Sequence, residues 1–150
     1  NFDVTNKIIG FSGSAFHKIY GRSGKFLELI KRALIDNKNF IFLMAGEGYS
    51  KPILDFIKKN GFENRFILLG HRRDINQVIK HIDIFINTYP ISGGLTIQLA
   101  VLNQKPIISY SSPDLTVNFV EDFLNVDRTI TFWQILRLFV PTANICNSFF

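Results

Sequence analysis

Short apolar runs and amphipathic segments alternate along the first two thirds of the chain, and this alternation limits the fold more than any other feature. Continuous apolar runs predict strands covered on both faces, and the amphipathic segments predict the covering helices. The predicted strands are residues 7–11, 40–45, 65–70, 83–87 and 105–109. The predicted helices are residues 25–35, 51–61, 74–82 and 94–103. Their short connections predict an α/β fold, a Rossmann-like three-layer sandwich with a mainly parallel sheet.

Local signals predict where three of these helices begin or end. Ser23 is a candidate N-cap for the first helix. Pro52 stands in the first turn of the second helix, and Gly61 follows its last apolar position. Asp74 and Gln77 have the spacing of a capping box at the start of the third helix. We expect that structural role for Asp74 rather than a catalytic one.

The alternation weakens after Ser109. Residues 110–150 contain two further candidate helices, in LTVNFVEDFL and FWQILRLFV, and end in an apolar stretch without clear period. We therefore interpret residues 1–150 as one domain with a less regular helical tail at 110–150. Because the chain begins at Asn1 rather than at methionine, we expect it to be processed or to be a fragment of a longer two-domain protein.

Charge and composition exclude several classes of protein. Seventeen Lys and Arg residues against twelve Asp and Glu give a net charge of +5, and the basic residues are scattered, which is typical of ordinary surface. Attraction to phosphate is the alternative, but no basic and aromatic array indicates nucleic acid. No apolar run is long enough for a membrane span. The single cysteine, Cys146, fits a reducing cytoplasmic setting.

The stretch NTYPISGGLTIQLAVLNQKPII carries the main candidate site. Gly93 and Gly94 separate a predicted strand from a helix that begins near Leu95 and Thr96, so the backbone can turn sharply and a ligand can approach it. The first amides of a helix lack internal partners and lie at the positive end of its dipole, which favours a phosphate. The Thr96 hydroxyl is a further candidate donor. The alternative is a plain turn capped by Ser92 or Thr96.

Other motifs of ligand chemistry are absent from the sequence. No cluster of His, Cys, Asp and Glu has metal-ligand spacing, and no Asp-x-Asp occurs. The chain also lacks a Gly-x-Gly-x-x-Gly fingerprint and a Walker loop, so NAD binding and ATP hydrolysis are not expected. We therefore expect neither a metal nor a resident cofactor.

The glycine turn and its surroundings resemble a known family. DIFINTYPISGGLTIQLAVLNQKPIIS resembles the nucleotide-diphosphate-binding segment in the carboxyl-terminal domain of GT-B glycosyltransferases. FIFLMAGEG, RFILLGHRRDI and GFSGSAFHKIYGRSGKFLELIKRAL resemble the family's preceding segments in the same order. The resemblance covers about Lys7 to Ser109. It is closest to the retaining, glycogen-synthase-like group, and the Gly-Gly-x-Thr turn is also similar to the inverting protein O-GlcNAc transferases.

The resemblance implies roles for particular residues. The implied contacts to the donor diphosphate are the turn residues Gly93, Gly94, Leu95 and Thr96, with Lys18 or Arg22 from the loop after the first strand. The implied contacts to the base or ribose are His71, Arg72 and Gln98, and the second glycine loop is represented by Glu47 and Gly48.

The resemblance also implies a function. The substrate would be a nucleotide-diphosphate sugar, with UDP or GDP as the nucleotide, bound without metal and used in polysaccharide biosynthesis. The setting would be the cytoplasm or the inner face of the membrane. A GT-B active site lies between two domains, so the resemblance implies an amino-terminal acceptor-binding domain that is missing from this chain. The 150-residue chain alone is therefore expected to be inactive.

One departure keeps alternatives open. Retaining members of the family carry a glutamate before the glycine turn and another early in the following helix. This chain has Pro90-Ile91-Ser92 before the turn and Gln98 and Leu99 in the helix. The catalytic residues and the stereochemical outcome are therefore unassigned. A sugar-nucleotide epimerase and a degenerate, non-catalytic nucleotide-sugar-binding module are the alternatives, whereas a receiver module is disfavoured because GFSGSAFHK lacks clustered acidic residues.

Overall fold

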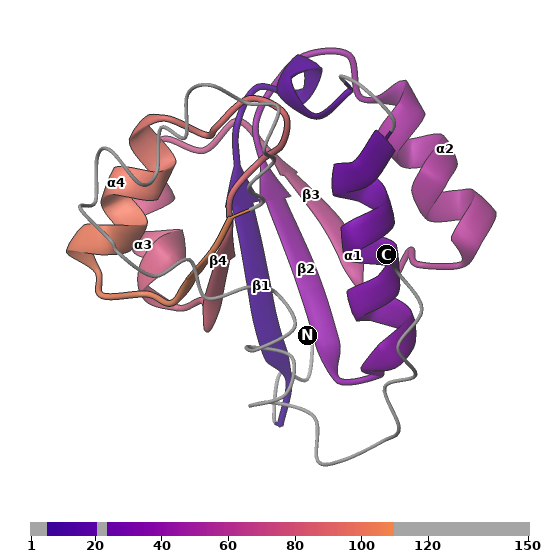
Figure 1. Cartoon of the computed structure of the whole chain (residues 1–150), viewed down its shortest axis with the longest axis horizontal. Helices are drawn as coiled ribbons and strands as arrows, with labels where there is room; N and C mark the ends of the chain where they lie inside the picture. The colour runs from indigo at the N-terminus through magenta and orange to yellow at the C-terminus, as the bar shows by residue number, and fades with distance from the viewer. Residues whose placement is uncertain (1–5, 21–23, 110–150) are drawn as a thin grey trace, which may run out of the picture.

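The computed structural model describes residues 6–20 and 24–109, which form one five-stranded sheet with helices on both faces (Figure 1). The strands are β1 (Ile8–Gly13), β2 (Phe40–Ala45), β3 (Phe66–Gly70), β4 (Ile84–Ile86) and β5 (Ile107–Ile108). The helices are the 3-10 helix η1 (Phe16–Ile19), α1 (Lys25–Asp36), α2 (Lys51–Asn60), α3 (Ile75–Lys80) and α4 (Leu95–Leu102). All strand pairs are parallel, so the predicted Rossmann-like fold is confirmed. The predicted tail at 110–150 lies outside the described residues.

The strand order β3-β2-β1-β4-β5 places a topological switch between β1 and β4. The connections from β1 to β3 run through α1 and α2 on one face, and those from β3 to β5 run through α3 and α4 on the other (Figure 1). Two separate apolar clusters match these two layers. In open parallel sheets a ligand crevice forms at the carboxyl ends of the strands beside such a switch. The fold therefore points to the loops after β1 and β4.

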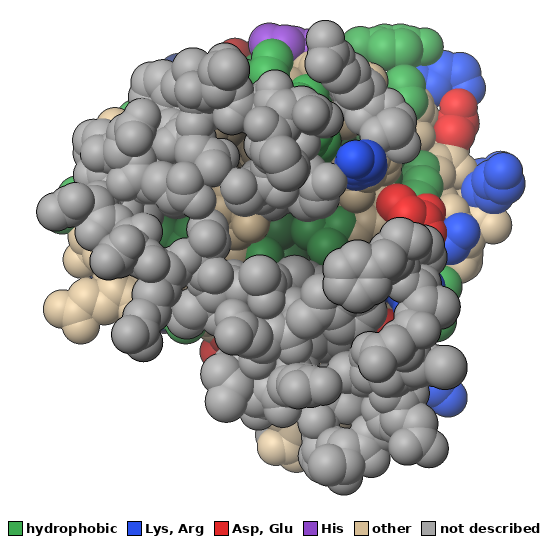
Figure 2. All heavy atoms as spheres, in the orientation of Figure 1, with side chains coloured by type: hydrophobic (Ala, Val, Ile, Leu, Met, Phe, Trp, Pro, Cys, Tyr) green, Lys and Arg blue, Asp and Glu red, His purple; other side chains and the backbone are tan. Residues whose placement is uncertain are grey.

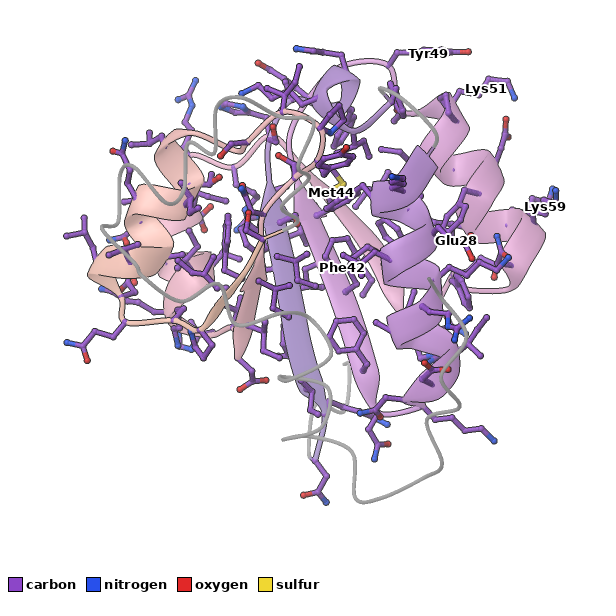
Figure 3. All side chains as sticks on the ribbon, in the orientation of Figure 1. Glu28, Phe42, Met44, Tyr49, Lys51 and Lys59 are labelled. Carbon is purple, nitrogen blue, oxygen red and sulfur yellow. The ribbon has the colours of Figure 1, made fainter. Side chains whose placement is uncertain are left out.

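The larger apolar cluster is built on aromatic rings between the sheet and the helices α1 and α2. Phe42, a residue of β2 labelled in Figure 3, is fully buried, and its side chain packs toward α1. Its ring meets the Phe66 ring edge to face at 4.9 Å between centroids, and the Phe26 ring lies 6.2 Å away. Such pairs add to the stabilisation that burial alone supplies. Phe42 therefore anchors this side of the sheet.

Helix ends agree with the sequence in one case and differ in another. Helix α2 begins with Pro52 in its first turn and ends at Gly61, which adopts a left-handed conformation with φ 68°. The capping box predicted for α3 is wrong, because Asp74 makes no side-chain cap hydrogen bond. Its carboxylate instead accepts two hydrogen bonds from Arg72, from Nε at 2.8 Å and from Nη2 at 2.6 Å. The predicted cap Ser23 lies outside the described residues.

At the right of Figure 2, Lys and Arg side chains lie close to Asp and Glu side chains. On α2, Lys51 pairs with Asp55 at 2.9 Å, and on α1, Arg32 lies 3.9 Å from Asp36. Exposed pairs of this kind contribute little to stability. None of the described helices combines the length and the apolar character that crossing a membrane requires.

Replacing Phe42 by alanine is expected to lower the free energy of unfolding by about 3–5 kcal/mol, because a fully buried ring is lost and a cavity remains. Urea unfolding followed by circular dichroism measures this change. Tyr49→Ala is the control, since 67% of the Tyr49 surface is exposed. Equal losses in the two variants would contradict the assignment of Phe42 to the core.

Replacing Arg72 by glutamine is expected to raise the pKa of Asp74 toward its ordinary value, because the hydrogen bond from Arg72 is the main cause of its lowering. A carboxyl group with a lowered pKa in the folded state adds stability above its unfolded pKa and loses it as the pH falls. An NMR titration of the Asp74 carboxyl measures the shift, with Arg73→Gln as the control. An unchanged Asp74 pKa in the Arg72 variant would show that the pair does not form.

Candidate functional site

The loops after β1 and β2 meet closely at the carboxyl edge of the sheet. The Ser14 amide donates to the Ala45 carbonyl at 3.0 Å, and the Phe16 amide donates to the Glu47 carbonyl at 2.9 Å. A Cβ atom on Gly46 would lie 1.9 Å from the Ser14 carbonyl oxygen. Glycine is therefore required at position 46 for this approach, and the two loops form one packed unit.

The glycine turn after β4 packs against the end of β1 in the same way. The Thr96 hydroxyl donates to the Gly13 carbonyl, and Thr96 Oγ1 also lies 3.2 Å from the Gly93 carbonyl oxygen. A Cβ atom on Gly93 would lie 2.7 Å from the Thr96 hydroxyl and 2.8 Å from the Gly13 carbonyl. Gly94 has φ 63° and ψ −115°, a conformation that side chains other than glycine rarely adopt. The close packing at Gly93 and the dihedral angles at Gly94 therefore explain why both positions are glycine.

Asn87 holds this turn, and sequence reasoning missed its role. Asn87 follows β4, and only 5% of its surface is exposed. Its Oδ1 atom accepts hydrogen bonds from the Gly93 amide at 3.0 Å and from the Ser92 hydroxyl at 3.1 Å. Its Nδ2 atom donates to the Ser109 hydroxyl at 3.2 Å. The available signal was a polar residue at the end of an apolar strand, but its partners cannot be identified from sequence.

The turn leaves three amides free at the start of α4. Neither Ser92 nor Thr96 makes a side-chain cap hydrogen bond to this helix, so the predicted capping role of these two residues is wrong. Among the described residues, the amides of Gly94, Leu95 and Thr96 have no hydrogen-bond partner. The Gly93 amide, which the sequence also assigned to an anion, is occupied by Asn87. In the part of the chain that the structure describes, three of these four amides therefore lack a hydrogen-bond partner.

Lys18 brings a positive charge to the same place. It lies in η1, is half-buried, and its Nζ atom donates to the Ser92 carbonyl at 3.2 Å. The two residues are 74 positions apart in the sequence, so the fold has brought the predicted basic loop to the predicted turn. An ammonium beside unpaired helix amides favours an anion such as a phosphate. Arg22, the alternative to Lys18, lies outside the described residues.

The remaining predicted residues form a second group, after β2 and β3. Glu47 Oε2 lies 3.7 Å from His71 Nδ1, and both side chains are exposed. Gly48, with φ 117°, continues this loop. The guanidinium of Arg72 is engaged by Asp74, so the structure does not present it as a free contact for a ligand. Gln98 is exposed on α4, one turn beyond the free amides.

Ionisable side chains offer little further chemistry in the described part of the chain. There, no group of three His, Cys, Asp or Glu residues could hold a metal ion. The Tyr20 hydroxyl donates to the Tyr49 carbonyl, and burial raises the pKa of Tyr20, with a smaller contribution from the charge of Tyr49. Backbone amides and one lysine are therefore the candidate groups for binding an anion here.

Three of the solved structures to which the chain is similar were determined with UDP bound. A variant of S. aureus TarM, bound to fondaparinux, alpha-GlcNAc-glycerol and UDP, matches 82% of this chain and 24% of its own, with a TM-score of 0.66 and 18% identity. The match to Anabaena HepE, bound to UDP and glucose, covers 71% of this chain and 30% of the HepE chain, with a TM-score of 0.61 and 22% identity. The match to the pneumococcal O-GlcNAc transferase GtfA, bound to UDP and GlcNAc, covers 72% of this chain and 21% of the GtfA chain. Its TM-score is 0.61 and the sequence identity is 19%.

These matches establish the fold alone, because the sequence identity is low in each case. No protein-family model and no curated protein matches the sequence. The chain spans 24% and 30% of the lengths of TarM and HepE, so it corresponds to a part of such enzymes. The described residues therefore have a fold that occurs in GT-B glycosyltransferases, as the glycine turn and its neighbouring segments predicted.

Proposed function

We propose that this chain is the donor-binding domain of a GT-B glycosyltransferase and that its glycine turn binds the diphosphate of UDP. The observation that carries the proposal is the meeting of three unpaired amides, Gly94 to Thr96, with the Lys18 ammonium at the switch between β1 and β4. UDP is favoured over GDP because TarM, HepE and GtfA, which share the fold, were solved with UDP.

The chemistry of such a site is electrostatic. When a sugar leaves a nucleoside diphosphate, negative charge grows on the diphosphate oxygens. Fixed amide dipoles and an ammonium stabilise that charge without reorganising during the reaction. In this chain the amides lie at the start of α4, and Lys18, in η1, donates to the Ser92 carbonyl of the same turn. Together they can bind both the substrate and the leaving diphosphate.

A transferase is favoured over a sugar-nucleotide epimerase, one of the two alternatives. The similar solved structures described above are transferases, which counts against a sugar-nucleotide epimerase. A non-catalytic module remains compatible with the absence of a carboxylate from residues 87–102. We propose that an acceptor-binding domain outside this chain completes the active site, because catalysis requires donor and acceptor to be held in reacting geometry. A cytoplasmic setting fits a nucleotide-sugar substrate.

The proposal predicts that UDP binds and that Lys18→Ala weakens this binding about tenfold or more, because a charge-assisted hydrogen bond contributes roughly 1.5–3 kcal/mol. Isothermal titration calorimetry measures the dissociation constant. Lys59→Ala is the matched control, since Lys59 points outward from α2 in Figure 3. No UDP binding by the unaltered chain would overturn the proposed function. Equal effects of the two lysine variants would assign Lys18 to ordinary surface charge.

The same titration with chelator is expected to give an unchanged UDP dissociation constant. The free amides and Lys18 supply the positive charge that a bridging cation otherwise provides. Added magnesium or manganese should alter the affinity by less than about twofold, a difference well below 1 kcal/mol. Binding that appears only with a divalent ion would contradict the proposed metal-independent cradle.

A further inference from the structure

Asn87 connects two parts of the proposed site, the glycine turn and the residue after β5. Its side chain is buried and makes three hydrogen bonds, two accepted and one donated. Two of them go to the glycine turn, at Ser92 and Gly93, and the third goes to Ser109, which follows β5. A buried amide with its polar atoms paired in this way has a fixed orientation. It can therefore hold the turn in one conformation.

The hydrogen bond to Gly93 decides which amides remain free. By accepting from the Gly93 amide, Asn87 Oδ1 holds the peptide between Ser92 and Gly93, and the unusual dihedral angles of Gly94 follow directly before α4. The amides of Gly94, Leu95 and Thr96, at the start of this helix, have no partner among the described residues. Without this acceptor the Gly93 amide has no described partner, and the turn loses its internal support.

Ser92 extends the same network to the lysine. Its hydroxyl donates to Asn87 Oδ1, and its carbonyl accepts from Lys18 Nζ. One buried side chain thus orients both the segment that bears the free amides and the carbonyl that holds the ammonium.

We propose that Asn87 is a positioning residue for the diphosphate. It does not contact the ligand, but it holds the free amides and Lys18 in the geometry that binds two phosphates. This inference rests on the proposed function, since it assigns a role within the same site. It predicts that loss of Asn87 weakens binding of the phosphates while contacts to the nucleoside remain.

The test is UDP titration of Asn87→Leu, which keeps a side chain of similar size but cannot accept hydrogen bonds. The UDP dissociation constant is expected to rise about tenfold or more, as for a hydrogen-bonded group left unpaired. Affinity for uridine, which has no phosphate and is followed by ligand-observed NMR, is expected to stay within about twofold. Ser109→Ala removes one bond to Asn87 and should weaken UDP binding by roughly threefold.

Ser12→Ala separates positioning from stability. Ser12 is also fully buried and its hydroxyl donates to the Ile86 carbonyl, but it makes no bond to the turn. This variant is expected to lower the melting temperature and to keep the UDP affinity. The inference is overturned if Asn87→Leu binds UDP as the unaltered chain does, or if Ser12→Ala weakens binding equally.

Two further outcomes are also decisive. If Asn87→Leu fails to fold, Ser109→Ala decides alone, and unchanged UDP binding by that variant overturns the inference. If uridine and UDP affinities fall together, Asn87 supports the fold and has no special role toward the phosphates. Absence of UDP binding by the unaltered chain instead counts against the proposed function.

Discussion

The contact between the end of β1 and the glycine turn after β4 is the constraint on which the proposed site depends. The Thr96 hydroxyl donates to the Gly13 carbonyl, and Gly93 fits beside both only because it has no side chain. This contact closes the switch between strands whose helices lie on opposite faces of the sheet. It also places the start of α4 next to the loop that carries Lys18. The position of the proposed phosphate site therefore depends on the topology together with Gly93 and Thr96.

The sheet could be predicted because its central strands are continuous apolar runs. The predicted strand 40–45 coincides with β2, a strand whose side chains are almost all buried. The first strand is longer than predicted, since it continues through Ser12 and Gly13. Ser12 is polar and interrupts the apolar run, yet it is buried because its hydroxyl donates to Ile86. At the edge of the sheet β5 is shorter than its apolar pattern, with Ile107–Ile108 as its only residues.

The site could be predicted only in outline, because its hydrogen bonds join distant residues. Two adjacent glycines between a strand and a helix indicated the turn, and the resemblance to GT-B enzymes indicated Lys18. The acceptor for the Gly93 amide is Asn87, six residues earlier, and no local rule selects it over solvent. Asp74 shows the opposite failure, since the capping-box spacing was present but Arg72 offered two charge-assisted hydrogen bonds. Local patterns could not rank these competing partners.

Backbone amide NMR during a UDP titration tests the central claim most directly, because it observes each proposed contact separately. The account predicts that the amide signals of Gly94, Leu95 and Thr96 shift most, with smaller changes at Gly93, whose amide already has a partner. Residues around Lys18 should shift with them as the ammonium turns toward the phosphates. Shifts confined to other parts of the sheet, or an unchanged glycine turn at saturating UDP, would contradict the account.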